Sequence, residues 1–123
     1  MTAPGAEEGV RDGVCARIIA GGRAVTLIKD SPGFVAQRIR AMVANLGCEM
    51  AHIGIAAPEE IDLALRLGLN YPLGPLELAA EMGPQNVLAM LERMQAITGE
   101  DRYRPSQWLR RRALLGLDIA APN

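Results

Sequence analysis

Gln37 is the residue of this 123-residue sequence whose type and setting most invite a chemical role. It is a single polar amide among apolar neighbours in the stretch "DSPGFVAQRIR". An amide at the edge of a cleft can donate a hydrogen bond to a carbonyl oxygen and accept one from a hydroxyl, so Gln37 could orient a substrate. Without a neighbouring domain it would be only a polar residue near a helix end.

Three other groups of residues could do chemistry, but each has a simpler interpretation. His52 is the only histidine, which excludes a metal site or proton shuttle built on two imidazoles. Glu59, Glu60 and Asp62 resemble paired catalytic carboxylates, yet acids in the first turn of a helix commonly complement its dipole. The run 110–112 of three arginines could meet a coenzyme phosphate, but a solvated helix face is the favoured interpretation.

The stretch "GLNYPLGP" is a loop, because prolines and glycines interrupt any helix there. It holds Asn70 and Tyr71 beside rigid prolines. Such a loop can line a cleft or can simply form the corner between two helices, and both interpretations stay open. The sequence has no G-x-S-x-G, H-E-x-x-H or P-loop motif, and no G-x-G-x-x-G after a strand, so it shows no nucleotide site. Its two cysteines have no metal-ligand spacing.

These residues must be positioned by helices whose ends are marked by proline and glycine. A first helix over 10–20 should end at Gly21-Gly22. The β-branched stretch 24–28 predicts a strand, which must pair with a segment outside this sequence or with a second copy. Further helices should begin at proline residues. The predicted fold class is all-α, a compact helical bundle preceded by one orphan strand, with helices starting at Pro32, Pro58, Pro75, Pro84 and Pro105.

The helix predicted for 32–53 carries two stripes of residues at helical spacing. Large apolar residues at 3–4 spacing predict the face that packs in the core. Small residues in line with Gln37 predict a face that another helix can approach closely, at a domain or subunit contact. The large stripe is Val35, Ile39, Met42, Val43, Leu46, Met50 and Ile53; the small stripe is Ala41, Ala44, Cys48 and Ala51.

The charge balance and the aromatic content of the chain argue against binding to nucleic acid or to a membrane. The 13 basic and 14 acidic residues nearly cancel, so no strong field favours nucleic acid or a membrane surface. Aromatic residues make up only 3% of the chain, which disfavours base stacking. No apolar run is long enough to cross a membrane, and the N-terminus lacks the pattern of a secretory signal. We therefore expect a soluble cytoplasmic protein with both cysteines reduced.

The stretches "DSPGFVAQRI" and "GIAAPEEIDLALRLGLNYPLGPLEL" resemble the C-terminal helical domain of the 3-hydroxyacyl-CoA dehydrogenase family. The family pattern is approximately D-x-P-G-F-x-x-N-R, then an E-D-I-D helix start, then G-x-x-x-P-x-G-P-F-E-L. The following "ITGEDRYRPSQWLRRRALLG" is similar to the second, carboxy-terminal copy of this domain in duplicated bacterial enzymes of the phenylacetate-degradation type.

The resemblance implies a fold like the C-terminal domain of 6-phosphogluconate dehydrogenase and a role shared with a Rossmann domain outside this chain. That domain would bind NAD and supply the catalytic His–Glu pair, and the orphan strand would lead out of its sheet. The helical domain would close the acyl-CoA cleft and form a homodimer. The implied division is a lead-in with a short helix over 1–23, the helical domain over 24–117 and a tail over 118–123.

The resemblance also assigns residues. Gln37 falls where the family has an active-site asparagine, and the implied substrate-binding residues are Phe34, Asn70, Tyr71, Gly74 and Pro75. Gln37 is one methylene longer than asparagine, and a misplacement near 1 Å can cost about 100-fold in rate. Leu76 for phenylalanine, Ala80 for aspartate and the missing K-T-G-x-G-F-Y segment also depart from the family. These departures indicate a degenerate, largely structural copy that is inactive alone.

Two alternatives remain at this point. One is a free-standing, non-catalytic helical module that dimerises through the small stripe and binds no ligand. The other is the helical domain of a different 3-hydroxyacid dehydrogenase, which the intact "NYPLGP" loop disfavours.

Overall fold

The computed structural model describes residues 5 and 7–121, and these belong to two compact units that divide between Ser31 and Pro32. The first unit contains helix α1 (Glu8–Ala20) and the extended segment after it. Helix α1 ends where the sequence predicts, at Gly21, and Gly22 is left-handed with φ 77°. It begins two residues before the predicted start. Of the lead-in predicted for residues 1–23, residues 1–4 and 6 lie outside the described part.

The predicted strand over 24–28 is wrong. These residues are extended and mostly exposed, but they have no strand assignment, and the described residues contain no strand with which they could pair. A single extended segment cannot satisfy its own backbone N–H and C=O groups, so β-branched residues alone do not make a strand. The expectation that this segment needs a partner outside the chain stays a prediction.

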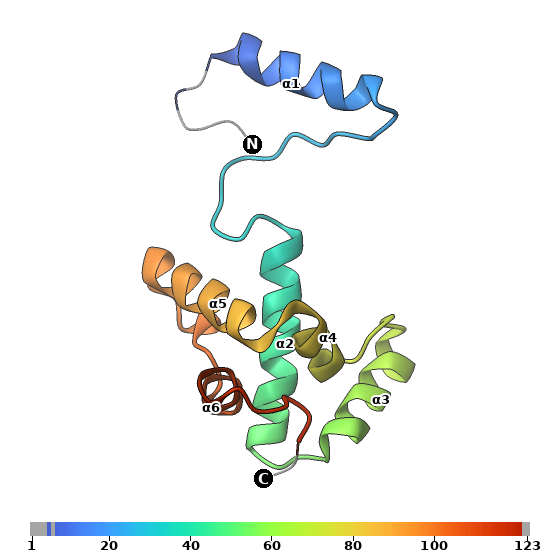
Figure 1. Ribbon diagram of the computed structural model, residues 1–123, viewed down its shortest axis with the longest axis vertical. Coiled ribbons are helices and arrows are strands. Elements are labelled where there is room, and N and C mark those ends of the chain that lie inside the picture. Colours follow the sequence, from blue (N-terminus) through green and yellow to red (C-terminus); the bar gives the residue numbers. More distant parts are fainter. Residues whose placement is uncertain (1–4, 6, 122–123) are drawn as a thin grey trace. The chain divides into compact units, whose positions relative to one another are not determined.

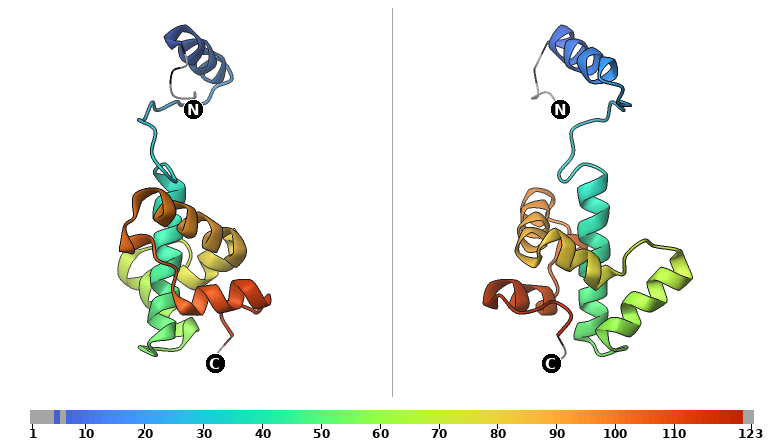
Figure 2. Two further views of the ribbon diagram at one scale, coloured as in Figure 1. Left: turned by 90° about the vertical axis from the view of Figure 1, so that its left-hand side faces the viewer. Right: turned by 45° about the vertical axis from the view of Figure 1, so that its right-hand side comes forward.

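The second unit is helical throughout its regular structure, which confirms the all-α fold. Helix α2 lies at its centre, with α5 and α6 to one side and α3 to the other (Figures 1 and 2). The elements are α2 (Ala36–His52), α3 (Pro58–Leu69), α4 (Pro75–Met82), α5 (Pro84–Thr98), the 3-10 helix η1 (Asp101–Tyr103) and α6 (Gln107–Leu115).

Local signals account for most helix ends. Three helices begin with proline, whose missing N–H is harmless in a first turn, and α5 and α6 end at left-handed glycines. Two starts differ from the prediction. Helix α2 begins at Ala36, because residues 32–35 form a turn, and α6 begins at Gln107, where the Ser106 hydroxyl accepts a hydrogen bond from the Leu109 N–H at 3.2 Å.

The two stripes of α2 face the opposite way from the prediction. The small stripe is inside: Ala41, Ala44 and Cys48 have no exposed surface, and α4, α5 and α6 pack around this helix. The large stripe is mostly outside: Ile39, Leu46 and Ile53 are each more than half exposed. Met42 and Met50 of this stripe are partly buried and pack against the core. The physical reason is that α4 approaches α2 too closely for large side chains to lie between them.

The end of the chain is tied to α6 rather than separate from the core. Ile119 is buried, and its carbonyl oxygen accepts a hydrogen bond from the Trp108 indole N–H at 2.8 Å. Arg112 lies over the Trp108 ring and donates to the carbonyl oxygen of Ala121. The predicted outward orientation of the arginine run is therefore wrong for Arg112, which is buried. Of the tail predicted for 118–123, residues 122–123 lie outside the described part.

Candidate functional site

Gln37 lies exposed on the first turn of α2, just after the turn with which the second unit begins. Phe34 lies three residues earlier, in the turn before the helix, and is half-buried, with a left-handed backbone at φ 48°. The sequence predicts both residues inside a helix that starts at Pro32. The structure has Gln37 in the helix and Phe34 in the turn before it, and the functional roles of both residues stay predictions.

The loop that carries Asn70 and Tyr71 joins α3 to α4. Asn70 ends α3 in the left-handed region at φ 53°, which asparagine tolerates well. Tyr71 follows and is 37% exposed. It lies beside Ile39 and Val43 of α2, where the three side chains line a trough of about 510 Å³ together with Leu78 of α4. The loop is thus both a helix–helix corner and the wall of a cleft.

Gly74 and Pro75 lie behind this loop, inside the domain. Gly74 has no room for a side chain because Asp62 fills the space, and the Pro75 ring lies against Gly47 of α2. Both residues are buried. Because both residues are buried, a ligand could touch Gly74 or Pro75 directly only if the domain opened. They could still affect ligand binding indirectly, by determining the shape of the loop.

Asp62 is the residue that fixes this corner. Its carboxylate accepts hydrogen bonds from the backbone N–H groups of Leu76 at 2.7 Å and Glu77 at 3.1 Å, at the start of α4. Burial raises the pKa of Asp62 above its ordinary value, and the two N–H groups oppose that shift in part. The sequence grouped Asp62 with two other acids at the start of α3, but its partner is the next helix.

The three acids at the start of α3 do not form a paired-carboxylate site. Glu60 accepts a hydrogen bond from the Ala57 N–H at 3.0 Å and so caps its own helix, Glu59 is exposed, and Asp62 points to α4. Among the residues that the structure describes, no three His, Cys, Asp or Glu side chains are placed to hold a metal ion.

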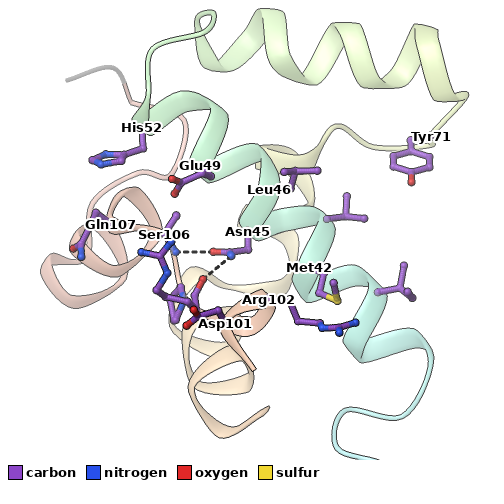
Figure 3. Close-up of a pocket in the computed structure, with 14 residues that line it drawn as sticks. Met42, Asn45, Leu46, Glu49, His52, Tyr71, Asp101, Arg102, Ser106 and Gln107 are labelled. Atoms are coloured by element: carbon purple, nitrogen blue, oxygen red, sulfur yellow. Dashed lines mark hydrogen bonds between the residues drawn. The ribbon is translucent and has the colours of Figure 1, made fainter. Parts of the chain in front are cut away.

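A second trough, of about 610 Å³, runs along the outward face of α2 (Figure 3). Tyr71 lies on one side of the helix and the 101–107 segment on the other. Asn45 anchors that segment: its amide donates to the Arg104 carbonyl oxygen at 2.9 Å, and its oxygen accepts from the Ser106 N–H at 2.8 Å. His52 also lines this trough near the end of α2, where it is exposed.

Sequence analysis missed two anchoring residues. Asn45 was not identified, because α2 also carries the amide Gln37 and several charged side chains, and residue type alone does not distinguish an anchoring amide from these. Arg38 is the second: its hydrogen bonds to the Pro32 carbonyl oxygen, at 2.7 and 3.2 Å, tie the turn over 32–35 to α2. Their partners are backbone groups, which composition and spacing do not reveal.

The family model for the C-terminal domain of 3-hydroxyacyl-CoA dehydrogenase matches residues 33–117. The chain belongs to this family. It is 46% identical over 94 residues to the 3-hydroxyadipyl-CoA dehydrogenase of Escherichia coli K12, an alignment that covers 76% of this chain and 20% of that enzyme. The resemblance seen in the hinge and loop motifs is therefore confirmed.

Solved structures of 3-hydroxyacyl-CoA dehydrogenase family members share the fold. The (S)-3-hydroxybutyryl-CoA dehydrogenase of Ralstonia eutropha matches with a TM-score of 0.87 at 30% identity, covering 95% of this chain and 44% of that one. The 3-hydroxybutyryl-CoA dehydrogenase of Escherichia coli K12 matches with a TM-score of 0.84 at 39% identity, covering 92% and 24%. This chain thus spans less than half the length of these dehydrogenases.

The described residues do not fit a dinucleotide such as NAD. A Rossmann site needs a glycine-rich turn between a strand and a helix, so that backbone N–H groups meet the pyrophosphate. The described part of this dehydrogenase domain contains no strand, and its glycine pair at 21–22 precedes the extended segment instead of following one. No helix in the described ranges is long and apolar enough to cross a membrane.

Proposed function

We propose that this chain is the substrate-side helical domain of an NAD-dependent enzyme that oxidises a 3-hydroxyacyl-CoA to the 3-oxoacyl-CoA. One observation carries the proposal: Gln37 is exposed on the first turn of α2, directly after the turn where the second unit begins. Membership of the dehydrogenase family supports it. An amide in this position is available to a ligand held at the N-terminal end of the domain.

In this account the acyl-CoA lies between the helical domain and a nucleotide-binding domain. Gln37 orients the substrate oxygen, while Phe34, Asn70 and Tyr71 form the wall. Gly74 and Pro75 set the shape of that wall from behind. The nucleotide-binding domain holds NAD, which accepts the hydride, so the chain studied alone should have no dehydrogenase activity. The free Cys15 and Cys48 suit a reducing compartment, and we place the enzyme in the cytoplasm.

The proposal is tested by calorimetric titration of the purified chain with acetoacetyl-CoA. The wild type should bind saturably, and Gln37→Ala should weaken binding by about tenfold, as expected when one hydrogen bond of about 1.4 kcal/mol is lost. The matched control is Gln95→Ala, which removes a half-buried glutamine from α5, away from the turn. It should bind like the wild type.

The outcomes separate the possibilities clearly. Equal loss in both variants would mean that binding depends on general stability rather than on Gln37. No saturable binding by a folded wild-type chain would contradict the substrate-side role. A parallel assay with 3-hydroxybutyryl-CoA and NAD should detect no turnover, and turnover by the chain alone would contradict the assignment of NAD to another domain.

We also propose that the domain pairs with a second copy of itself, through the outward face of α2. Dimerisation through the small stripe of α2, which the sequence suggested, is wrong, because the side chains of that stripe are buried inside one domain. The outward face instead exposes Ile39, Leu46 and Ile53. The trough there carries Glu49 and Asp101 as well as Arg102 and Arg104. In a two-fold symmetric dimer the same patch of both copies is in contact, so the patch must be complementary to itself. A rim that carries both acidic and basic side chains meets this requirement, because the acids of one copy can pair with the arginines of the other.

A further inference from the structure

The turn before α2 contains a bulky residue in a conformation that favours glycine. Gly33 and Phe34 are consecutive left-handed residues, with φ 72° and 48°. Glycine adopts this region freely, whereas a phenylalanine there is a genuine outlier, because its Cβ crowds the backbone. A turn alone would be made more easily by glycine or asparagine at position 34. The strain at Phe34 therefore needs a reason.

The surrounding domain holds the turn in place. The Arg38 guanidinium donates to the Pro32 carbonyl oxygen at 2.7 and 3.2 Å, and the Arg38 backbone N–H donates to the Gly33 carbonyl oxygen at 2.9 Å. The same guanidinium lies 5.7 Å from the centre of the buried Tyr103 ring. Gly33 packs so closely that a Cβ there would stand 2.6 Å from the Met94 sulfur. The turn is thus fixed to the core on two sides.

Packing in the core cluster does not account for Phe34. It is the only phenylalanine in the chain, and a side chain of this size is normally among the first to enter a core. Yet Phe34 is only half-buried and does not belong to the core cluster, in which Tyr103 and Trp108 are the aromatic members. A strained backbone at a residue outside the core cluster is characteristic of functional positions.

We infer that Arg38 is a positioning residue, which holds the strained turn so that the Phe34 ring is presented to the acyl-CoA beside Gln37. This inference rests on the proposed function, and it adds a role for Arg38 and a reason for the strain. Phe34 lies in the turn directly before α2, and Gln37 follows three residues later, exposed on the first turn of the helix. Arg38 does not touch the ligand; it acts through the backbone of residues 32–34.

The first test separates strain from packing and needs no ligand. Phe34→Gly removes both the ring and the strain, so the inference expects the melting temperature to stay the same or to rise by a few degrees. Phe34→Asn, which also tolerates the left-handed region, should behave alike. A fall in melting temperature by more than about 8 °C in both variants would show that the ring is needed for packing, and it would overturn the inference.

The second test measures acetoacetyl-CoA affinity at a temperature where every variant is folded. Arg38→Met keeps the packing of the stem and removes the guanidinium, and we expect it to raise Kd about tenfold. In a Phe34→Gly background the same change should have almost no further effect, because there is no ring left to position. A merely structural role would give additive losses. The matched control is Arg93→Met, which removes an exposed arginine of α5.

The failures of the two proposals are distinguishable. Saturable binding by the wild type that is unchanged in Arg38→Met, or additive with Phe34→Gly, would overturn the positioning role and leave the proposed function standing. No saturable binding by the folded wild type would overturn the proposed function and the positioning role with it.

Discussion

Gly47 of α2 lies directly against the ring of Pro75 at the start of α4, so that any side chain on Gly47 would overlap the ring. Both residues are buried. This contact sets how closely α4 approaches α2, and it explains why α2 turns its small residues inward. It also fixes the base of the loop that carries Asn70 and Tyr71.

Substitution of Gly47 by alanine should destabilise the domain. The new methyl group must displace Pro75, and overpacking of this kind costs about 1–3 kcal/mol, more than the gain of up to about 1 kcal/mol in helix propensity. The matched control is Gly68→Ala in α3, where an added Cβ meets nothing within 4 Å. Urea denaturation should show a loss for the first variant and a small gain for the second. A gain in both would contradict the close contact.

The ends of the helices could be predicted because their signals are local. The prolines at 75 and 84 and the glycines at 83 and 99 each act on their own backbone, and α4 and α5 begin at the predicted prolines. The inward face of α2 could not be predicted in this way. Both stripes have helical spacing, and the choice between them depends on how closely another helix approaches.

The candidate site was predictable in its positions but not in its connections. The loop over 70–74 follows from its prolines and glycines, and the functional roles of Gln37, Asn70 and Tyr71 stay predictions. Asp62 accepts hydrogen bonds from the backbone N–H groups of Leu76 and Glu77, which are 14 and 15 positions further along the chain. No periodic pattern in the sequence indicates a contact at that separation. The strand over 24–28 failed for the opposite reason: its local propensity is real, but a strand exists only with a partner.

Asp62 should make the stability of the domain depend on pH. Because burial raises its pKa in the folded state, the folded chain binds more protons than the unfolded chain between about pH 3.9 and the folded pKa. The contribution of Asp62 to stability is therefore fully present below that window and declines as pH rises through it. A lowered folded pKa would give the opposite slope.

The reference for this measurement is Asp62→Asn, which does not titrate. The side-chain NH₂ group of this variant would point at the backbone N–H of Glu77, so that two donors face each other. We therefore expect the variant to lose about 1–3 kcal/mol of unfolding free energy at acidic pH. The difference in unfolding free energy between wild type and variant should shrink as pH rises. Denaturation curves between pH 3 and pH 7 would measure it. A difference that widens over this range would contradict the burial effect.

The two cysteines should differ sharply in reactivity. Cys48 is fully buried, and burial raises the pKa of its thiol to about 12, so almost no thiolate forms at pH 8. Cys15 lies partly exposed on α1. Alkylation of the native chain at pH 8, followed by mass spectrometry, should label Cys15 quickly and Cys48 only after urea is added. Rapid labelling of Cys48 in the native chain would show that α2 separates from its neighbours.

The outward face of α2 should control self-association. Leu46 is 59% exposed in the trough, so Leu46→Glu should leave the domain folded but place a charge in the proposed contact. Sedimentation should then show a dimer for the wild type and a monomer for the variant. Leu67→Glu, at the 77% exposed leucine of α3, is the matched control and should remain dimeric. A monomeric wild type would contradict this surface as a contact between copies.

The central claim is that the N-terminal end of the second unit contacts an acyl-CoA, and amide chemical-shift mapping tests it most directly. A chain of 13.2 kDa is well suited to this measurement. Titration with acetoacetyl-CoA should move the amide signals of residues 33–38 and 70–74 and leave those of α6 unchanged. Signals that move only along α6, or none that move at saturating ligand, would contradict the account.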